Sequence, residues 1–118
     1  KKIPFVNEKL RMTAALKNIE KRKLGTLIVL NNKKFTTGIL TDGDLKRVSN
    51  LSTNLNSLQI KEVMKKNPIS VDKNILAVEA LSIMNTKKIT SLCVHNNKLK
   101  NSTIGFIHIH NILNSNIT

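Results

Sequence analysis

Two carboxylates, a hydroxyl and two cations are concentrated in the segment Thr41-Asp42-Gly43-Asp44-Leu45-Lys46-Arg47. Thr41 can cap a helix that begins here, and Asp44, three residues later, completes a capping box at the positive end of that helix. The free backbone N–H groups of a helix start suit an anion, and Lys46 or Arg47 can neutralise a phosphate. Asp44 can also accept hydrogen bonds from a sugar diol. The segment therefore indicates a site for a phosphorylated small molecule or nucleotide, although a capping box alone explains the same spacing.

The elements that must position this segment follow from the apolar pattern of the chain. Residues 26–30 and 91–94 are short, almost continuously apolar runs, which are typical of strands buried on both faces. An amphipathic helix precedes each run, because apolar side chains recur at i, i+3, i+4 and i+7. The members of the two stripes are Met12, Ala15, Leu16 and Ile19, and Ala77, Ala80, Leu81 and Met84. An Asn/Lys turn and a further strand follow each run, and short helices over 44–48 and 111–113 are expected to close the two units.

The same order of elements occurs twice because the chain contains an internal repeat. A shift of 65 residues places Pro4–Lys33 on Ile69–Lys98 with nine identities among thirty positions. The alignment resumes two residues out of step, with Gly38 on Gly105, which predicts a longer hairpin loop around Leu99–Thr103. Two copies of one unit are therefore expected, and they should pack together because each is too small to bury an adequate core alone.

The repeat sets the expected domain boundaries at residues 1–48 for the first copy and 60–118 for the second. The segment 49–59 between them is rich in Ser and Asn and is the expected linker. Its leucines have near-helical spacing and can either anchor the connector on the protein or form part of a dimer face. They are Leu51, Leu55 and Leu58.

The repeat and the segment Gly38-Ile39-Leu40-Thr41-Asp42-Gly43-Asp44 resemble the CBS domain pair, known as a Bateman module, over essentially the whole chain. That family places the pattern G-h-x-T/S-x-x-D at the end of its last strand, where Gly38, Thr41 and Asp44 match it. The resemblance implies an α/β (α+β) fold of two CBS repeats, each a small three-stranded sheet with two helices, packed with pseudo-two-fold symmetry. It also implies that Thr41 contacts the phosphate and Asp44 the ribose hydroxyls of a nucleotide bound between the copies.

The second copy departs from this pattern. His108 stands where the first copy has Thr41, and Asn111 replaces Asp44. We therefore expect no second equivalent nucleotide site, although His108, His110 and Asn111 can contribute to a divergent ligand site. The complete set of candidate ligand-binding residues is Gly38, Thr41, Asp42, Asp44, Lys46, Arg47, His108, His110 and Asn111.

The pair His108 and His110 also has the spacing of two metal ligands on one face of a strand. No Cys, Asp or Glu lies beside the pair in sequence to complete a metal site, and the two rings would not share a face if a helix began at His108. The seven acidic residues include one close pair, Asp42 and Asp44, which is already assigned to ligand capture. We therefore expect neither a metal site nor a catalytic site in this chain, and no required cofactor.

A finer resemblance is to the C-terminal part of arabinose-5-phosphate isomerases, which open the Kdo pathway of lipopolysaccharide synthesis. It is carried by Leu24-Gly25, by Thr41–Arg47, and by the ending Lys88–Leu92 with Ile107–Leu113. In these enzymes an N-terminal SIS (sugar isomerase) domain converts ribulose 5-phosphate to arabinose 5-phosphate, and two CBS units close the chain. The resemblance implies that this chain is the regulatory half of such an enzyme. It further implies a SIS domain of the same polypeptide as partner, a homodimer, and a regulatory ligand such as an adenine nucleotide or CMP-Kdo.

Two other interpretations of the same features stay open. Some sugar nucleotidyltransferases carry an N-terminal CBS pair with a T-D-G-D-h-R-R motif similar to the one at Thr41–Arg47. A structural dimerisation module without a ligand is the second alternative, if the interaction of Thr41 with Asp44 is only a capping box.

Composition restricts the partners and the location of the protein. The net charge of +13 favours a phosphorylated ligand over nucleic acid, because the lysines are scattered and the chain has no Trp, no Tyr and three Phe to stack on bases. The single cysteine, Cys93, lies in an apolar strand and is expected in the core. One Cys, no apolar run of transmembrane length and no signal-peptide pattern indicate a cytoplasmic protein without a membrane partner.

Overall fold

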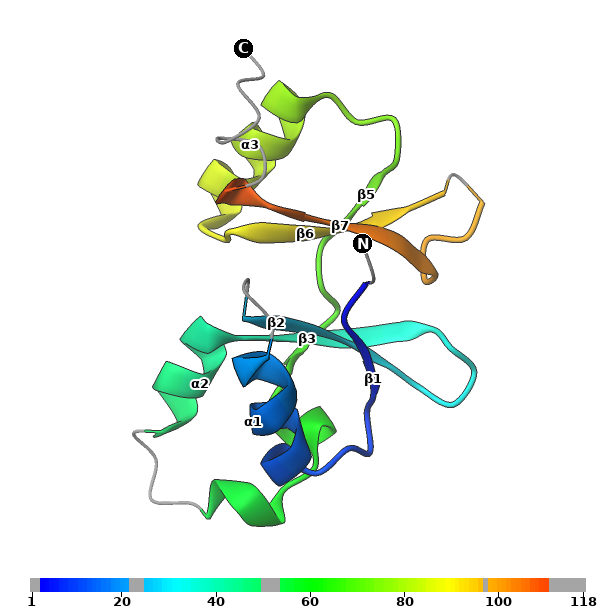
Figure 1. Cartoon of the computed structure of the whole chain (residues 1–118). Coiled ribbons are helices and arrows are strands. Elements are labelled where there is room, and N and C mark those ends of the chain that lie inside the picture. The colour runs from blue at the N-terminus through cyan, green and yellow to red at the C-terminus, as the bar shows by residue number, and fades with distance from the viewer. Residues whose placement is uncertain (1–2, 22–24, 50–53, 97, 111–118) are drawn as a thin grey trace. The chain divides into compact units, whose positions relative to one another are not determined.

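The computed structural model describes residues 3–21, 25–49, 54–96 and 98–110 (Figure 1). The chain divides into two compact units, Lys1–Pro68 and Ile69–Thr118. Each unit is a mixed sheet with its own helices and its own apolar core, as the internal repeat predicts. None of the described helices is long and apolar enough to cross a membrane.

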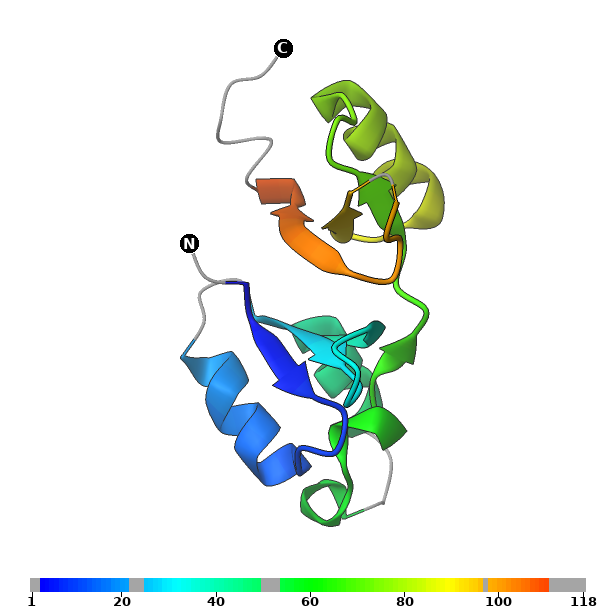
Figure 2. The ribbon, with the colours of Figure 1, turned by 90° about the vertical axis from the view of Figure 1, so that its right-hand side faces the viewer.

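The strands of the first unit are β1 (Phe5–Asn7), β2 (Thr26–Leu30), β3 (Thr36–Thr41) and β4 (Lys65–Lys66). They form a four-stranded sheet in the order β1-β2-β3-β4, in which β1 runs parallel to β2 and the other pairs are antiparallel (Figure 2). The helices are α1 (Met12–Glu20) and α2 (Asp42–Ser49), followed by two 3-10 turns, η1 (Leu55–Ser57) and η2 (Ile60–Glu62).

The core of the first unit lies between its sheet and its helices. The expected apolar stripe of α1 is confirmed, and its side chains meet those of β2 and β3. The buried members of this core are Met12, Ala15, Ile19, Leu27, Val29, Leu40, Ile60 and Val63. Leu45 and Val48 of α2 pack against the same core, so that α1 and α2 cover one face of the sheet (Figure 1). Leu55 and Leu58 also pack there and anchor the connector, whereas Leu51 lies outside the described residues.

Residues 60–68, which the expected domain boundary assigns to the second copy, pack with the first compact unit. Ile60 and Val63 are buried in its core. β4 pairs antiparallel with the outer edge of β3 and satisfies part of that edge. The first sheet therefore has four strands where three were expected, because the incoming segment adds a short strand to it.

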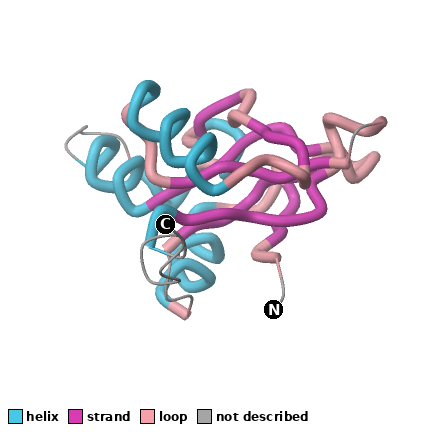
Figure 3. The backbone as a smooth tube through the Cα atoms, turned by 90° about the horizontal axis from the view of Figure 1, so that it is seen from above, coloured by secondary structure: helices cyan, strands magenta, loops and turns pink. Residues whose placement is uncertain are grey.

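The second unit repeats this plan with three strands. Figure 3 shows the helices of the whole chain in cyan and its strands in magenta. β5 (Ser70–Asp72) runs parallel to β6 (Ser91–His95), which pairs antiparallel with β7 (Thr103–His108). The helix α3 (Ala77–Lys87) packs on this sheet, and the buried core residues are Val71, Ala80, Met84 and Leu92. Cys93 on β6 is buried, as expected. The helix expected over 111–113 lies outside the described residues, although Ile109 and His110 before it already have helical backbone.

The strand registers confirm the internal repeat. Val29 lies opposite Gly38 in the first unit, and Val94 lies opposite Gly105 in the second, with a register shift next to the valine each time. Residues 31–35 separate β2 from β3, and residues 96–102 separate β6 from β7. The second connection is therefore the longer one by two residues, as the alignment predicts.

Candidate ligand-binding site at the end of β3

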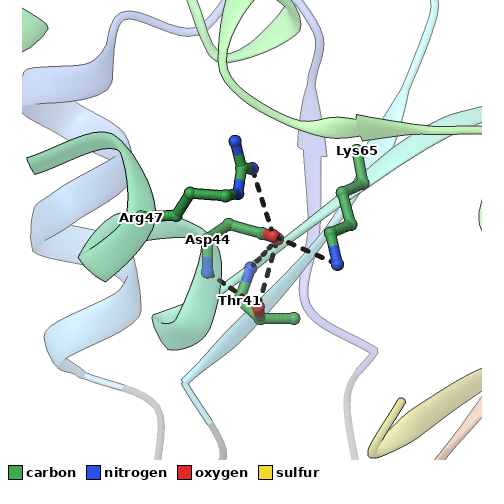
Figure 4. Close-up of polar contacts among 4 residues, drawn as sticks. All are labelled: Thr41, Asp44, Arg47 and Lys65. Carbon is green, nitrogen blue, oxygen red and sulfur yellow. Dashed lines mark hydrogen bonds and ion pairs between the residues drawn. The ribbon is translucent and has the colours of Figure 1, made fainter. Parts of the chain in front are cut away.

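The segment Thr41–Arg47 forms the corner at which β3 ends and α2 begins (Figure 4). The expected capping box is present. The Asp44 N–H donates to Thr41 Oγ1 at 3.2 Å, and the Thr41 N–H donates to Asp44 Oδ2 at 3.0 Å. The Thr41 hydroxyl donates a further hydrogen bond to the same carboxylate oxygen at 3.1 Å. These contacts fix the start of α2 and hold the Asp44 carboxylate in one orientation.

The other carboxylate oxygen of Asp44 faces two cations. Arg47 Nη2 lies 3.4 Å from Asp44 Oδ1, and Lys65 Nζ lies 3.7 Å from the same atom. The Asp44 side chain is only 2% exposed, whereas those of Arg47 and Lys65 are 56% and 59% exposed. Both distances exceed the ~2.7–2.9 Å of strong charge-assisted hydrogen bonds, so both ion pairs are loose. Two solvent-facing cations, Arg47 and Lys65, thus share one buried carboxylate, and this excess of cations leaves positive charge at the corner.

Lys65 is a member of this cluster that the sequence analysis did not select. It comes close to Asp44 because β4 lies beside β3, with Lys65 opposite Ile39. No local sequence pattern sets Lys65 apart from the other lysines of the chain. Its position depends on the packing of residues 60–68 against the first unit, which is a tertiary effect.

Gly38 has a packing role that explains its place in the motif. A Cβ at this position would collide with Met64 Sδ, and it would lie 2.7 Å from Met64 Cγ and 2.9 Å from the Lys65 carbonyl oxygen. The absence of a side chain lets Met64 and Lys65 approach β3 this closely. Gly38 therefore contributes to the candidate site indirectly, because it admits the strand that carries Lys65.

Asp42 and Lys46 lie on the exposed surface of α2. The Asp42 N–H donates to the Gly25 carbonyl at 3.1 Å, and its carboxylate lies where a Cβ on Gly25 would be. Gly25 also has a left-handed φ of +59°, a conformation that L side chains rarely adopt. Gly25 thus makes room for the first turn of α2, which accounts structurally for a glycine that the sequence analysis noted. Leu24 lies outside the described residues.

His108 and His110 lie at the equivalent corner of the second unit. Their rings stack with centroids 4.8 Å apart, and the His110 N–H donates to His108 Nδ1 at 3.2 Å. The rings thus lie side by side although the helical backbone begins at Ile109. Burial lowers the pKa of His108, and the nearby charge of His110 lowers this pKa further. Asn111 lies outside the described residues, among which no group of three or more His, Cys, Asp or Glu side chains is placed to hold a metal ion.

The predicted site residues therefore fall into two groups. The corner of the first unit brings Thr41, Asp44 and Arg47 together and adds Lys65, while the two histidines belong to the second unit. A hydroxyl, a carboxylate and two cations at one corner can bind a ligand that carries hydroxyl groups and an anionic group.

Comparison with known proteins gives a consistent picture. The profile of the CBS domain matches residues 1–50 and 60–116. Arabinose 5-phosphate isomerase KdsD of Yersinia pestis is 35% identical over 115 residues, which are 98% of this chain and 34% of that protein. The chain thus spans about a third of the length of this curated relative.

Solved structures share the fold at low sequence identity. A CBS-domain containing protein from Agrobacterium tumefaciens superposes with a TM-score of 0.86 at 20% identity, covering 99% of this chain and 91% of that one. CBSX2, whose structure was solved in complex with AMP, superposes with a TM-score of 0.80 at 20% identity, covering 96% of this chain and 86% of the other.

Proposed function

This chain belongs to the CBS domain family, and we propose that it is a regulatory module that binds a nucleotide or nucleotide-sugar at the corner between β3 and α2. One observation carries the proposal: a carboxylate that is 2% exposed shares one oxygen with two cations whose side chains are more than half exposed. Hydroxyl groups of a sugar suit the carboxylate, and a phosphate suits the cations. The AMP complex of CBSX2 supports an adenine nucleotide as the first ligand to test.

The similarity to KdsD supports a proposal for the parent protein. We infer that this module regulates a sugar-phosphate isomerase that converts ribulose 5-phosphate to arabinose 5-phosphate on a SIS domain of the same polypeptide. A late product of the Kdo pathway, such as CMP-Kdo, would then act as a feedback ligand in the cytoplasm. The effect on catalysis would be a coupling free energy between the two sites, typically about 1–3 kcal/mol. Homodimerisation through the module is part of the same proposal.

A structural module without a ligand is the second candidate, and a specific contact favours it. The Asp44 carboxylate already accepts two hydrogen bonds from Thr41 and faces Arg47 and Lys65. An acidic residue in a capping box can have this set of partners for the stability of the helix start alone.

Thermal unfolding of the chain against AMP, CMP and CMP-Kdo separates these functions. A ligand at 100 times its dissociation constant should stabilise the folded protein by about 2.7 kcal/mol. We expect one of the three to raise the melting temperature of the wild type and of Glu20→Gln, which removes an exposed charge on α1, but not that of Asp44→Asn. No shift with any of the three in the wild type would contradict nucleotide sensing and favour the structural module.

A further inference from the structure

The two oxygens of the Asp44 carboxylate have different surroundings. Oδ2 accepts hydrogen bonds from the backbone N–H and the hydroxyl of Thr41, at 3.0 Å and 3.1 Å. These bonds belong to the capping box, so Oδ2 cannot change partners without loosening the start of α2. Oδ1 has the Arg47 guanidinium at 3.4 Å and the Lys65 ammonium at 3.7 Å. Oδ1 is therefore the oxygen that can change partners at low cost.

Of the two cations, Lys65 is the easier one to move. Arg47 is three residues from Asp44 on the same helix, and its Nη2 makes a hydrogen bond to Oδ1. Lys65 comes from a different element, β4, and lies farther from Oδ1, and its side chain is 59% exposed. An ammonium group on a flexible four-carbon stem can swing to a new partner without moving the backbone.

We propose that ligand binding at this corner exchanges the partners of Asp44: a ligand hydroxyl displaces Lys65 from Oδ1, and the released Lys65 ammonium binds the phosphate of the same ligand. This inference rests on the proposed function and specifies the chemical class of its ligand. The ligand must carry adjacent hydroxyl groups and a phosphate on one molecule, as a nucleoside monophosphate or a sugar phosphate does. Lys65 is then a specificity-determining residue of the site.

The two halves of such a ligand are poor ligands on their own. A nucleoside without phosphate would displace Lys65 from a buried carboxylate and return no partner to the ammonium group. Inorganic phosphate would bind Lys65 but supply no sugar diol to Asp44, so that Oδ1 loses one partner and faces a second anion. Only a ligand with both hydroxyl groups and a phosphate leaves every charge paired. The ion pair of Lys65 with Asp44 is then replaced by a hydrogen bond from the ligand hydroxyl to Asp44 and by an ion pair of Lys65 with the phosphate.

Lys66 provides a matched control for this proposal. It is the neighbour of Lys65 on the same two-residue strand, and it is exposed. Side chains of successive residues on a strand point to opposite faces, so Lys66 points away from the side on which Lys65 meets Asp44. Lys65→Met and Lys66→Met therefore remove the same charge from the same strand and keep a similar length of side chain.

Calorimetric titration of the whole chain with AMP, adenosine, CMP, cytidine and inorganic phosphate tests the exchange. We expect the wild type to bind one nucleotide about tenfold or more tightly than its nucleoside, because one charge-assisted contact is added. In Lys65→Met the nucleotide should weaken by about tenfold while the nucleoside binds equally well or more tightly, since it no longer displaces an ammonium group. Lys66→Met should keep the preference of the wild type.

The outcomes separate this inference from the function on which it rests. Binding of no nucleotide to the wild type would refute the proposed function and, with it, the exchange. Binding that is lost in Asp44→Asn but keeps its preference for nucleotide over nucleoside in Lys65→Met would leave nucleotide sensing intact and refute the exchange. Equal weakening of nucleotide and nucleoside in Lys65→Met would also refute it, because that result indicates a purely structural lysine. Inorganic phosphate that binds the wild type as tightly as the nucleotide would show that the hydroxyl groups contribute nothing, and would refute it as well.

Discussion

Replacement of Gly38 by alanine tests how β4 is held against β3. The new Cβ would lie 2.7 Å from Met64 Cγ and 2.9 Å from the Lys65 carbonyl oxygen, and it would collide with Met64 Sδ. The flexible Met64 side chain can turn away, but the Lys65 carbonyl can retreat only if the backbone of β4 moves. Alanine at this position should therefore push β4 outward and carry the Lys65 side chain away from Asp44.

The expected loss of stability in Gly38→Ala can be compared with the effect of alanine at two other glycines of the chain. Overpacking of this kind costs about 1–3 kcal/mol. Gly43 on α2 is the permissive case, because the nearest atom to an added Cβ is Thr41 Oγ1 at 3.6 Å. Alanine there should stabilise the helix by roughly 0.5–1 kcal/mol. The variants Gly38→Ala and Gly43→Ala should thus differ by roughly 1.5–4 kcal/mol in free energy of unfolding.

Gly105, the equivalent of Gly38 in the second unit, is the control for position within the repeat. Its added Cβ would lie 3.3 Å from the Cβ of Val94, so that this neighbour must move by only a few tenths of an ångström. We expect Gly105→Ala to change the stability by less than about 1 kcal/mol.

Urea unfolding followed by far-ultraviolet circular dichroism measures these differences, since the chain has no Trp or Tyr for fluorescence. Amide hydrogen exchange then shows whether the loss is confined to the first unit. Equal stability of Gly38→Ala and Gly43→Ala would refute the reasoning. So would an equal loss in Gly38→Ala and Gly105→Ala, because the second unit has no described strand equivalent to β4.

Two further predictions concern the second unit. Burial raises the pKa of the Cys93 thiol, and a hydrogen bond from Thr103 opposes this rise only in part. A thiol reagent at neutral pH should therefore react slowly with the native protein and quickly with the protein unfolded in urea. Fast reaction of the native protein would contradict the burial. The pKa of His108 is lowered in the folded protein, whereas the unfolded chain keeps the usual pKa of ~6.5. Between these two pKa values the unfolded chain binds more protons than the folded protein. The stability present above pH ~6.5 is therefore lost as the pH falls through that window. An NMR titration of the imidazole signals should place the midpoint of His108 below ~6.5, and His110→Asn should raise it only partway, because burial is the larger cause; an unchanged midpoint in that variant would exclude the contribution of His110.

The fold was predictable where one residue pattern dictates one kind of packing. The apolar stripes of α1 and α3 have helical spacing. The continuous apolar runs of β2 and β6 favour strands whose side chains are buried on both faces of the sheet. The offset of Gly38 from Gly105 located the longer loop, because each glycine lies opposite the equivalent valine of its hairpin. The fourth strand was missed, since two consecutive lysines carry no strand pattern and pair with β3 only through tertiary packing.

The candidate site was predictable to the same extent. The capping box of Thr41 and Asp44 is a local interaction between residues three apart, so its hydrogen bonds could be predicted from the spacing alone. The unequal surroundings of the two Asp44 oxygens are not local, because one of the cations comes from β4. Gly38 was expected as part of a ligand motif, and the structure adds a second reason for it, since a Cβ added there would collide with Met64.

Residues 60–68 pack with the first unit, so that a division of the chain at residue 59 would damage that unit. A cut near residue 59 would remove Ile60 and Val63 from the first core and strip β4 from its sheet. The exposed edge of β3 could then form hydrogen bonds with strands of other chains, which promotes aggregation. An exchange of the second unit for that of a homologue therefore keeps the first core whole when residues 60–68 stay with the first unit. The first unit of this pair thus depends on residues that lie beyond its own copy of the repeat, because the segment that leads into the second copy completes its core and its sheet.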